Sequence, residues 1–254
     1  MTFLRIFKTV FLAIFLVAWN CLAYDFAPGE FEELRDVSLE VLMKYPPSEY
    51  YYVTVGRSPG AIERVLEFYS PHSTIPVPIS GVKGRPGVSS KSSPPLSELE
   101  EQNLFQAWAR LKVPTSEQLG GKKLLLIDYT QEAKGLISAY DYLGKYCGKG
   151  CRLEALALPQ MAFEKDPLLP HNRKRRTIHV LDMKRRPILR VKLGSRQYKG
   201  FSTYGRFDPT QQTAPTAQDE NLIADFIQSL HTKLIQSRTS CMSAAFNQGL
   251  HAHH

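Results

Sequence analysis

Apolar positions along this chain alternate between helical spacing and short continuous runs. Over residues 30–45, Phe31, Leu34 and Val41 fall on one helical face, and a proline pair ends the helix. Further helices are expected over residues 59–68, 97–111 and 134–146. Runs rich in β-branched, aromatic and leucine side chains predict strands over residues 50–55, 75–79, 123–127 and 152–158. Strands that alternate with helices at this spacing indicate an α/β fold with a parallel sheet.

Two of the helix starts carry capping signals. Ser58 suits an N-cap, with Pro59 at the first helical position, where a missing N–H has no cost. Ser97 followed by Glu100 has the pattern of a capping box. The first of these helices directly follows the strand at 50–55, so the carboxyl end of that strand should face a helix N-terminus.

The pattern is weaker outside these elements. Residues 177–181 and 187–193 predict two strands of a hairpin around a basic turn, and residues 219–236 predict a closing helix. The stretch 80–95, rich in Gly, Ser, Pro and Lys, is expected to be a flexible loop next to an edge strand at 75–79. One α/β domain over residues 24–236 accounts for these elements, and residues 237–254 are expected to be disordered.

The first 23 residues have the pattern of a secretory signal peptide. Arg5 and Lys8 precede an apolar run, and Cys21 and Ala23 are the small residues that a signal peptidase reads. The run is shorter than the roughly 20 residues of a membrane anchor, so no transmembrane span is expected in the mature chain. Lipid attachment at Cys21 is an alternative that Trp19 and its neighbours oppose, because small residues are needed there. We therefore expect an exported protein, periplasmic or secreted.

Composition narrows the class of protein only a little. Of 254 residues, 43% are hydrophobic and 22% charged, which excludes collagen-like, coiled-coil and wholly disordered chains. The net charge of +8 favours anionic partners without naming one. Cys147 and Cys151, in the sequence CGKGC, either form a disulfide in an oxidising compartment or remain free thiols. A single cysteine pair without neighbouring histidines predicts no metal site.

Two segments and the loop between them carry a family resemblance. Residues 53–60, VTVGRSPG, end a strand in a glycine-rich turn, and residues 124–135, LLLIDYTQEAKG, end another in an acidic residue and a loop. With the flexible stretch 80–95 between them, this order resembles the phosphoribosyltransferases of purine and pyrimidine salvage. The resemblance covers roughly residues 50–158. It implies a phosphoribosyltransferase-like core with a parallel sheet and a flexible hood loop. The helix predicted over residues 219–236 follows this core at its C-terminal end.

The resemblance implies a site for phosphoribosyl pyrophosphate (PRPP) or a similar ligand at the carboxyl ends of these strands. In that family the first turn touches the pyrophosphate, and acidic residues hold the ribose hydroxyls. The loop after them binds the 5′-phosphate through backbone N–H groups. If PRPP is the ligand, the resemblance implies that Mg²⁺ binds together with it. The resemblance also implies that Asp128 is the candidate catalytic residue. The implied ligand-binding residues are Gly56, Arg57, Ser58, Gly60, Asp128, Tyr129, Thr130, Lys134 and Gly135.

The second of these loops departs from the family pattern. Tyr129 stands in place of the second acid, Ala133 in place of Thr, and Lys134 in place of Gly. Glu132 adds a negative charge beside the expected phosphate. We therefore expect an exported protein that binds a phosphorylated or sugar-like ligand. The departures weigh against glycosyl transfer, and catalysis is left open.

A serine hydrolase is one alternative. The turn after the first strand matches the Gly-x-Ser-x-Gly elbow of that class. Ser58, Asp128 and either His171 or His179 follow the chain order of an α/β-hydrolase triad. Pro59 opposes this alternative, because the residue after the nucleophile donates its N–H to the oxyanion hole and proline has none.

A non-catalytic interaction module is the other alternative, and two basic clusters support it. They comprise Arg173, Lys174, Arg175 and Arg176, and Lys184, Arg185 and Arg186. An anionic macromolecule or surface could dock on them, although no aromatic residues are interleaved as single-stranded nucleic acid would favour. A solvated loop or a charged sheet edge explains the same residues without a partner.

Overall fold

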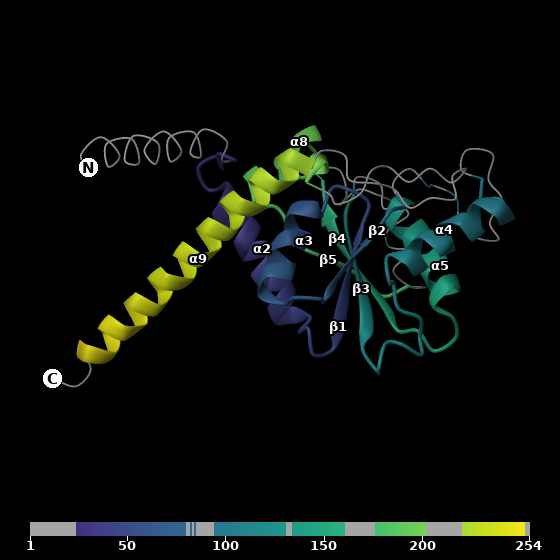
Figure 1. Ribbon diagram of the computed structural model, residues 1–254, viewed down its shortest axis with the longest axis horizontal. Helices are drawn as coiled ribbons and strands as arrows, with labels where there is room; N and C mark the ends of the chain where they lie inside the picture. The colour runs from purple at the N-terminus through teal and green to yellow at the C-terminus, as the bar shows by residue number, and fades with distance from the viewer. Residues whose placement is uncertain are drawn as a thin grey trace, which may run out of the picture.

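The computed structural model describes residues 24–79, 82, 84, 94–130, 134–160, 176–201 and 220–251. The signal peptide predicted at 1–23 and most of the loop 80–95 lie outside these residues. Within the described residues, five parallel strands form one sheet in the order β2-β1-β3-β4-β5 (Figure 1). They are β1 (Tyr50–Val55), β2 (Thr74–Val77), β3 (Lys123–Thr130), β4 (Leu153–Pro159) and β5 (Ile178–Val180). The predicted α/β class and parallel sheet are confirmed.

Helices cover both faces of this sheet (Figure 1). One face carries α2 (Glu30–Lys44), α3 (Gly60–Tyr69), α7 (Pro187–Lys192), α8 (Arg196–Gly200) and α9 (Glu220–His251), and the other carries α4 (Glu98–Arg110) and α5 (Lys134–Cys147). Successive side chains of a strand point to opposite faces, so Leu125 and Ile127 enter one core and Leu124 and Leu126 the other. Burial on both faces is why this strand is a continuous apolar run in the sequence.

The predicted helix starts have different outcomes. The capping box of α4 is confirmed, since Ser97 Oγ accepts from Glu100 N–H at 3.3 Å and Glu100 Oε2 accepts from Ser97 N–H at 2.8 Å. The prediction of Ser58 as the N-cap of α3 is wrong, because the helix begins at Gly60 and no side chain caps it. The N–H of Gly60 donates to Arg57 O at 3.3 Å, so the chain is still turning at Ser58.

The hairpin predicted around residues 177–193 is also wrong. β5 pairs with β4 in parallel, and the second predicted strand is the helix α7. Pro187 lies in the first turn of this helix, where proline is tolerated, and the spacing of Leu189 and Leu193 buries both. α9 continues to His251, although the sequence predicts an end near Gln236 and a disordered tail (Figure 1). Among the described helices, none is long and apolar enough to cross a membrane.

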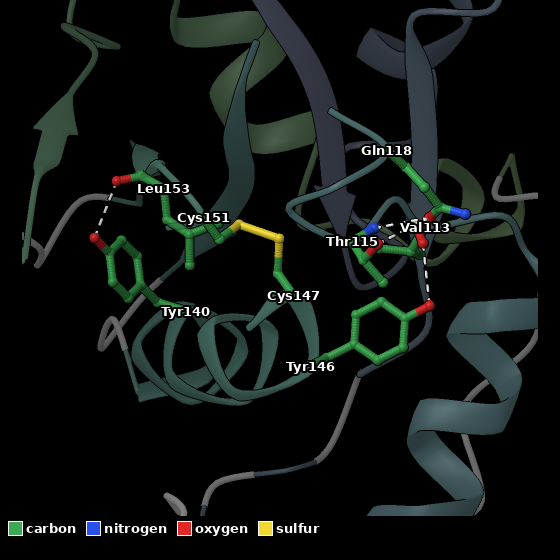
Figure 2. The surroundings of a disulfide bond; sticks show 8 residues. All are labelled: Val113, Thr115, Gln118, Tyr140, Tyr146, Cys147, Cys151 and Leu153. Carbon is green, nitrogen blue, oxygen red and sulfur yellow. Dashed lines mark hydrogen bonds between the residues drawn. A yellow bond between two sulfur atoms is a disulfide. The ribbon is translucent and has the colours of Figure 1, made fainter. Parts of the chain in front are cut away.

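Cys147, the last residue of α5, forms a disulfide with Cys151 (Figure 2). Their Cα atoms lie 5.9 Å apart. The structure thus decides between the disulfide and the free thiols that the sequence left open. Tyr140, on the same helix, donates its hydroxyl to Leu153 O at 3.0 Å (Figure 2). The disulfide and this hydrogen bond both join α5 to the beginning of β4.

A buried carboxylate joins the elements on the other side of the sheet. The Glu30 side chain is fully buried at the start of α2 and accepts hydrogen bonds from Tyr24 OH at 2.7 Å, Tyr198 OH at 2.9 Å and Ala27 N–H at 2.9 Å. Lys192 Nζ lies 3.2 Å from the same carboxylate. Burial alone raises the pKa of Glu30, but these donors hold the pKa below its ordinary value. The ionised carboxylate therefore links the N-terminal segment, α2, α7 and α8.

Removal of the disulfide should lower the free energy of unfolding by about 2 kcal/mol, because a short loop in the unfolded chain loses its constraint. Urea unfolding of the C147S/C151S variant, with and without reductant, measures this. The wild-type protein in reductant should match the variant, and the variant should not respond to reductant. A wild-type protein whose stability ignores reductant would contradict the prediction.

Glu30→Gln should lower the free energy of unfolding at pH 7 by about 2–4 kcal/mol, because the charge-assisted hydrogen bonds and the Lys192 ion pair are lost. The folded pKa of Glu30 lies below the unfolded value, so its stabilising contribution is complete above about pH 4.3 and is lost as the pH falls through the folded pKa. Urea unfolding of both proteins from pH 7 to pH 3 should show the difference shrinking. A difference that stays constant with pH would rule out the charged role.

Candidate functional site

The carboxyl ends of β1 and β3 lie side by side where the order of strands reverses. β2 is on one side of β1, whereas β3, β4 and β5 follow on the other. In open parallel sheets, ligands bind in the crevice at this point. The register pairs Val53 with Leu126 and Thr54 with Ile127, so the turn 56–60 and the segment after Ile127 leave the sheet next to each other. The structure thus brings together the segments 53–60 and 124–135 that the resemblance singled out. Residues 131–133 are not among the residues that the structure describes.

The turn after β1 leads directly into the N-terminus of α3. Gly56 has a φ of 69°, which favours glycine, and its N–H donates to Val77 O at 3.1 Å. Arg57 and Ser58 follow and are both half-buried. Because first-turn N–H groups of a helix lack intrahelical partners, the start of α3 at Gly60 presents a partial positive charge at this edge.

A buried acid lies beneath this turn, and sequence reasoning did not identify it. Glu63, in the first turn of α3, is 4% exposed and accepts a hydrogen bond from Thr54 Oγ1 at 2.6 Å. Burial raises the pKa of Glu63, and the charge of Arg64 and the Thr54 hydrogen bond oppose that rise. The signal in the sequence was the position of this glutamate between two apolar pairs, Ala61-Ile62 and Val65-Leu66, on one helical face.

The two residues that the family pattern places together as acids point to opposite faces of the sheet. Asp128 follows Leu124 and Leu126 onto the α5 face, where its Oδ2 lies 3.8 Å from the position that a Cβ on Gly135 would take. Tyr129 points to the α7 face and donates its hydroxyl to Arg190 O at 2.7 Å. Asp128 and Gly135 can therefore contact one ligand together, whereas Tyr129 supports the packing of α7.

Burial raises the pKa of the Asp128 carboxyl well above its ordinary value, and the hydrogen bond from Tyr129 N–H only partly opposes this. The raised pKa keeps this carboxyl protonated up to a higher pH than a solvated aspartate. A protonated carboxyl both donates and accepts hydrogen bonds, as sugar hydroxyls require. A raised pKa is typical of functional carboxyl groups.

The remaining predicted ligand residues lie around Asp128. Thr130 is buried at the end of β3, and its carbonyl accepts from Gln160 N–H at 3.1 Å. Lys134 is the exposed first residue of α5, and Gly135 follows it. The structure therefore places these side chains at the same edge of the sheet as the turn 56–60.

A small pocket of about 260 Å³ lies at this edge, beyond the ends of β4 and β5. Its lining residues are Pro159, Gln160, Val180, Leu181, Asp182, Met183, Lys184 and Arg190. The carbonyl of Arg190 accepts the hydrogen bond from the Tyr129 hydroxyl. The Nε atom of Arg190 is buried and has no hydrogen-bond partner among the described residues. Sequence reasoning assigned Arg190 to a strand and so did not place it at the carboxyl edge.

Some residues of the two basic clusters form ion pairs with carboxylates, whereas others are exposed. Arg176 donates to both carboxylate oxygens of Asp141, at 2.7 and 2.8 Å, and its side chain is only 8% exposed. Arg186 pairs with Glu40 and also donates to the carbonyl of Asp182 at 2.8 Å. Lys184 and Arg185 are exposed, and residues 173–175 lie outside the description. The described part of the clusters is therefore not one continuous basic surface.

The predicted hydrolase residues are not brought together. His179 Nε2 lies 3.1 Å from Glu154 Oε2, and Glu154 accepts from the hydroxyl of Tyr50, the first residue of β1, at 3.1 Å. Ser58 follows the opposite end of β1. The imidazole of His179 is therefore at the other edge of the sheet from this serine, and His171 lies outside the description.

Comparison of the chain with protein-family models, curated proteins and solved structures finds no match. Among the described residues, no group of three or more His, Cys, Asp or Glu side chains is placed to hold a metal ion. Among the predicted ligand residues that the structure describes, Asp128 supplies the one carboxyl. The arrangement is suited to hydrogen bonding and anion contact.

Asp128→Asn should raise the free energy of unfolding at pH 7 by about 1–3 kcal/mol, because it removes a carboxyl that is costly to ionise where it lies. The folded pKa lies above the unfolded value, so the wild-type protein loses stability as the pH rises from about 4 to the folded pKa. Urea unfolding of both proteins from pH 4 to pH 9 should show the variant gaining its advantage over that range. An advantage already present at pH 4, or none at pH 9, would contradict the assignment.

Proposed function

We propose that this domain is a phosphoribosyltransferase-like core that binds a phosphorylated or sugar-like small molecule at the carboxyl edge of the sheet. The observation that carries the proposal is the position of Asp128. This carboxyl has a raised pKa and lies at the end of the central strand β3, next to the strand that ends in the turn 56–60 and beside the start of α5.

The anionic part of the ligand would contact the turn after β1. Arg57 supplies a cationic side chain, and the start of α3 supplies backbone N–H groups with a favourable dipole. Gly56 is half-buried and has no Cβ, so a ligand can approach its backbone closely. These features suit a phosphate group more than an uncharged one.

The sugar-like part of the ligand would contact Asp128. Its carboxyl can accept hydrogen bonds from a pair of hydroxyl groups and, when protonated, can also donate one. Gly135 lies beside it without a side chain, so ligand atoms can reach the carboxyl from the α5 side. In the family that the chain resembles, the turn after the first strand likewise contacts the anionic group, and the acidic residues contact the ribose hydroxyls.

The same residues support binding more than transfer. The position of a second acid is taken by Tyr129, whose hydroxyl is engaged with the Arg190 carbonyl on the other face of the sheet. If transfer occurs, the chain would act by positioning the ligand and by neutralising charge at an oxocarbenium-like centre. The ion pairs of Arg176 and Arg186 favour this small-ligand proposal over docking of an anionic macromolecule.

We also propose that the protein is exported. The segment 1–23 has the signal-peptide pattern, and the disulfide between Cys147 and Cys151 is a bond that persists in oxidising compartments. An exported protein would meet phosphorylated or sugar-like molecules other than the cytosolic metabolite PRPP, which agrees with the departures from the family pattern.

A phosphorylated sugar should raise the melting temperature of the mature chain, residues 24–254. At a ligand concentration tenfold above Kd, binding adds about 1.4 kcal/mol, which corresponds to about 3–5 °C for a domain of this size. The probes are PRPP with Mg²⁺, ribose 5-phosphate, ribose and inorganic phosphate. Arg57→Ala and Asp128→Asn should each lower the shift, measured against the variant's own unliganded melting temperature.

Arg185→Ala serves as the matched control, because it removes one exposed positive charge outside the proposed site. This variant should keep the full shift. A sugar phosphate that shifts the wild type and both site variants equally would overturn the proposal, as would the absence of any shift with all four probes at about 10 mM.

A further inference from the structure

A second pocket lies at the opposite, amino edge of the sheet. Its volume is about 330 Å³, and it is formed between the turn that precedes β3, the loop that precedes β1 and the residue that precedes β4. Its lining residues are Ser48, Glu49, Gly120, Gly121, Lys122, Lys123 and Arg152. None of these residues belongs to the carboxyl edge described above.

Two of the lining cations have no carboxylate partner among the described residues. Lys122 Nζ donates to the carbonyl of Pro47 at 2.8 Å, and the Arg152 guanidinium donates to the carbonyl of Gly121. Lys123, by contrast, is paired with Glu154 at 2.8 Å. Hydrogen bonds to carbonyls orient the first two cations at the pocket without neutralising them. Glu49 is the acidic residue of the lining, and it is exposed.

The backbone of the turn adds donors to this positive charge. Gly120 and Gly121 have φ values of 56° and 87°, and Lys122 N–H closes the turn on Leu119 O at 3.0 Å. This is the geometry of a turn whose two central residues must be left-handed, which glycine adopts without strain. A Cβ on either glycine would meet no atom within 4 Å, so a ligand can reach the backbone there. No described residue accepts a hydrogen bond from the N–H of Gly120 or Gly121.

The disulfide helps to hold one wall of the pocket. Cys151 directly precedes Arg152, and Leu124 N–H donates to Arg152 O at 2.9 Å. The backbone of Arg152 is therefore fixed between the covalent bond to α5 and the pairing of β3 with β4. A cation held in place loses less conformational freedom when it binds an anion.

We propose that this amino-edge pocket binds the phosphate group of a small molecule. The guanidinium of Arg152 offers a planar set of donors, Lys122 offers a compact charge, and the Gly120-Gly121 backbone offers N–H groups. Together these donors match a tetrahedral oxyanion with several acceptor oxygens. The volume suits a phosphate group and a small attached moiety, and free phosphate and a phosphomonoester share the chemistry.

Amide NMR of the ¹⁵N-labelled mature chain, titrated with inorganic phosphate and then with glycerol 3-phosphate, tests this proposal. The amide signals of Gly120, Gly121 and Arg152 should shift and saturate. The K122A/R152A variant should raise Kd about tenfold or more, because it removes both charge-assisted contacts. Comparison of the two probes separates a site for free phosphate from one that prefers a phosphomonoester.

Lys149→Ala is the matched control for charge. Lys149 is exposed in the neighbouring disulfide loop but does not line the pocket, so its loss should change Kd less than about twofold. Gly120→Asn is a second test, which keeps every charge and adds a side chain where the backbone is open. Asparagine tolerates left-handed φ values, so this variant should fold and bind phosphate more weakly.

The carboxyl-edge proposal can fail independently, because Gly56, Arg57 and Gly60 report on that site in the same spectra. Arg57→Ala should leave the shifts of Gly120 and Gly121 unchanged. Three results would overturn the amino-edge site: no saturating shift at about 10 mM phosphate, equal weakening by Lys149→Ala and by the double variant, or unchanged binding in Gly120→Asn.

Discussion

The helical layer over one face of the sheet depends on the buried carboxylate of Glu30. Its partners come from the N-terminal segment, from α7 and from α8, so one charge joins parts of the chain far apart in sequence. An ionised carboxylate this deeply buried is stable only when its donors are all in place. Because α7 carries the carbonyl that accepts from Tyr129, this interaction also sets one boundary of the carboxyl edge.

The two edges of the sheet differ in how their charged side chains are paired. At the amino edge, one connected set of partners joins four strands through Tyr50 of β1, Lys123 of β3, Glu154 of β4 and His179 of β5. At the carboxyl edge, Asp128 accepts a hydrogen bond from Tyr129 N–H, and desolvation raises its pKa. Paired charges stabilise a fold, whereas a carboxyl kept away from cations is a cost that a ligand can offset.

The geometry of the candidate site is set by the backbone at the ends of β1 and β3. The left-handed turn at Gly56 directs the chain away from β1, and α3 begins after it. The pleat of β3 sends Asp128 and Tyr129 to opposite faces, so only the first is available to a ligand on the α5 side. In this chain the hydroxyl of Tyr129 is instead engaged with the carbonyl of Arg190.

The sequence by itself determined the class of fold, the four longer strands, the capping box of Ser97 and the two segments that form the carboxyl edge. Local spacing of apolar residues carries that information, because it reflects burial on one or two faces. The helical state of residues 187–192 and the parallel pairing of β5 depended on contacts between distant segments. The same is true of Arg176 and Arg186, which appear as basic clusters in the sequence but are neutralised by Asp141 and Glu40. The disulfide joins cysteines that are four positions apart, and the sequence left its formation open. The tertiary structure decided these features because a charge or a short apolar run has no fixed role until its partner is brought beside it.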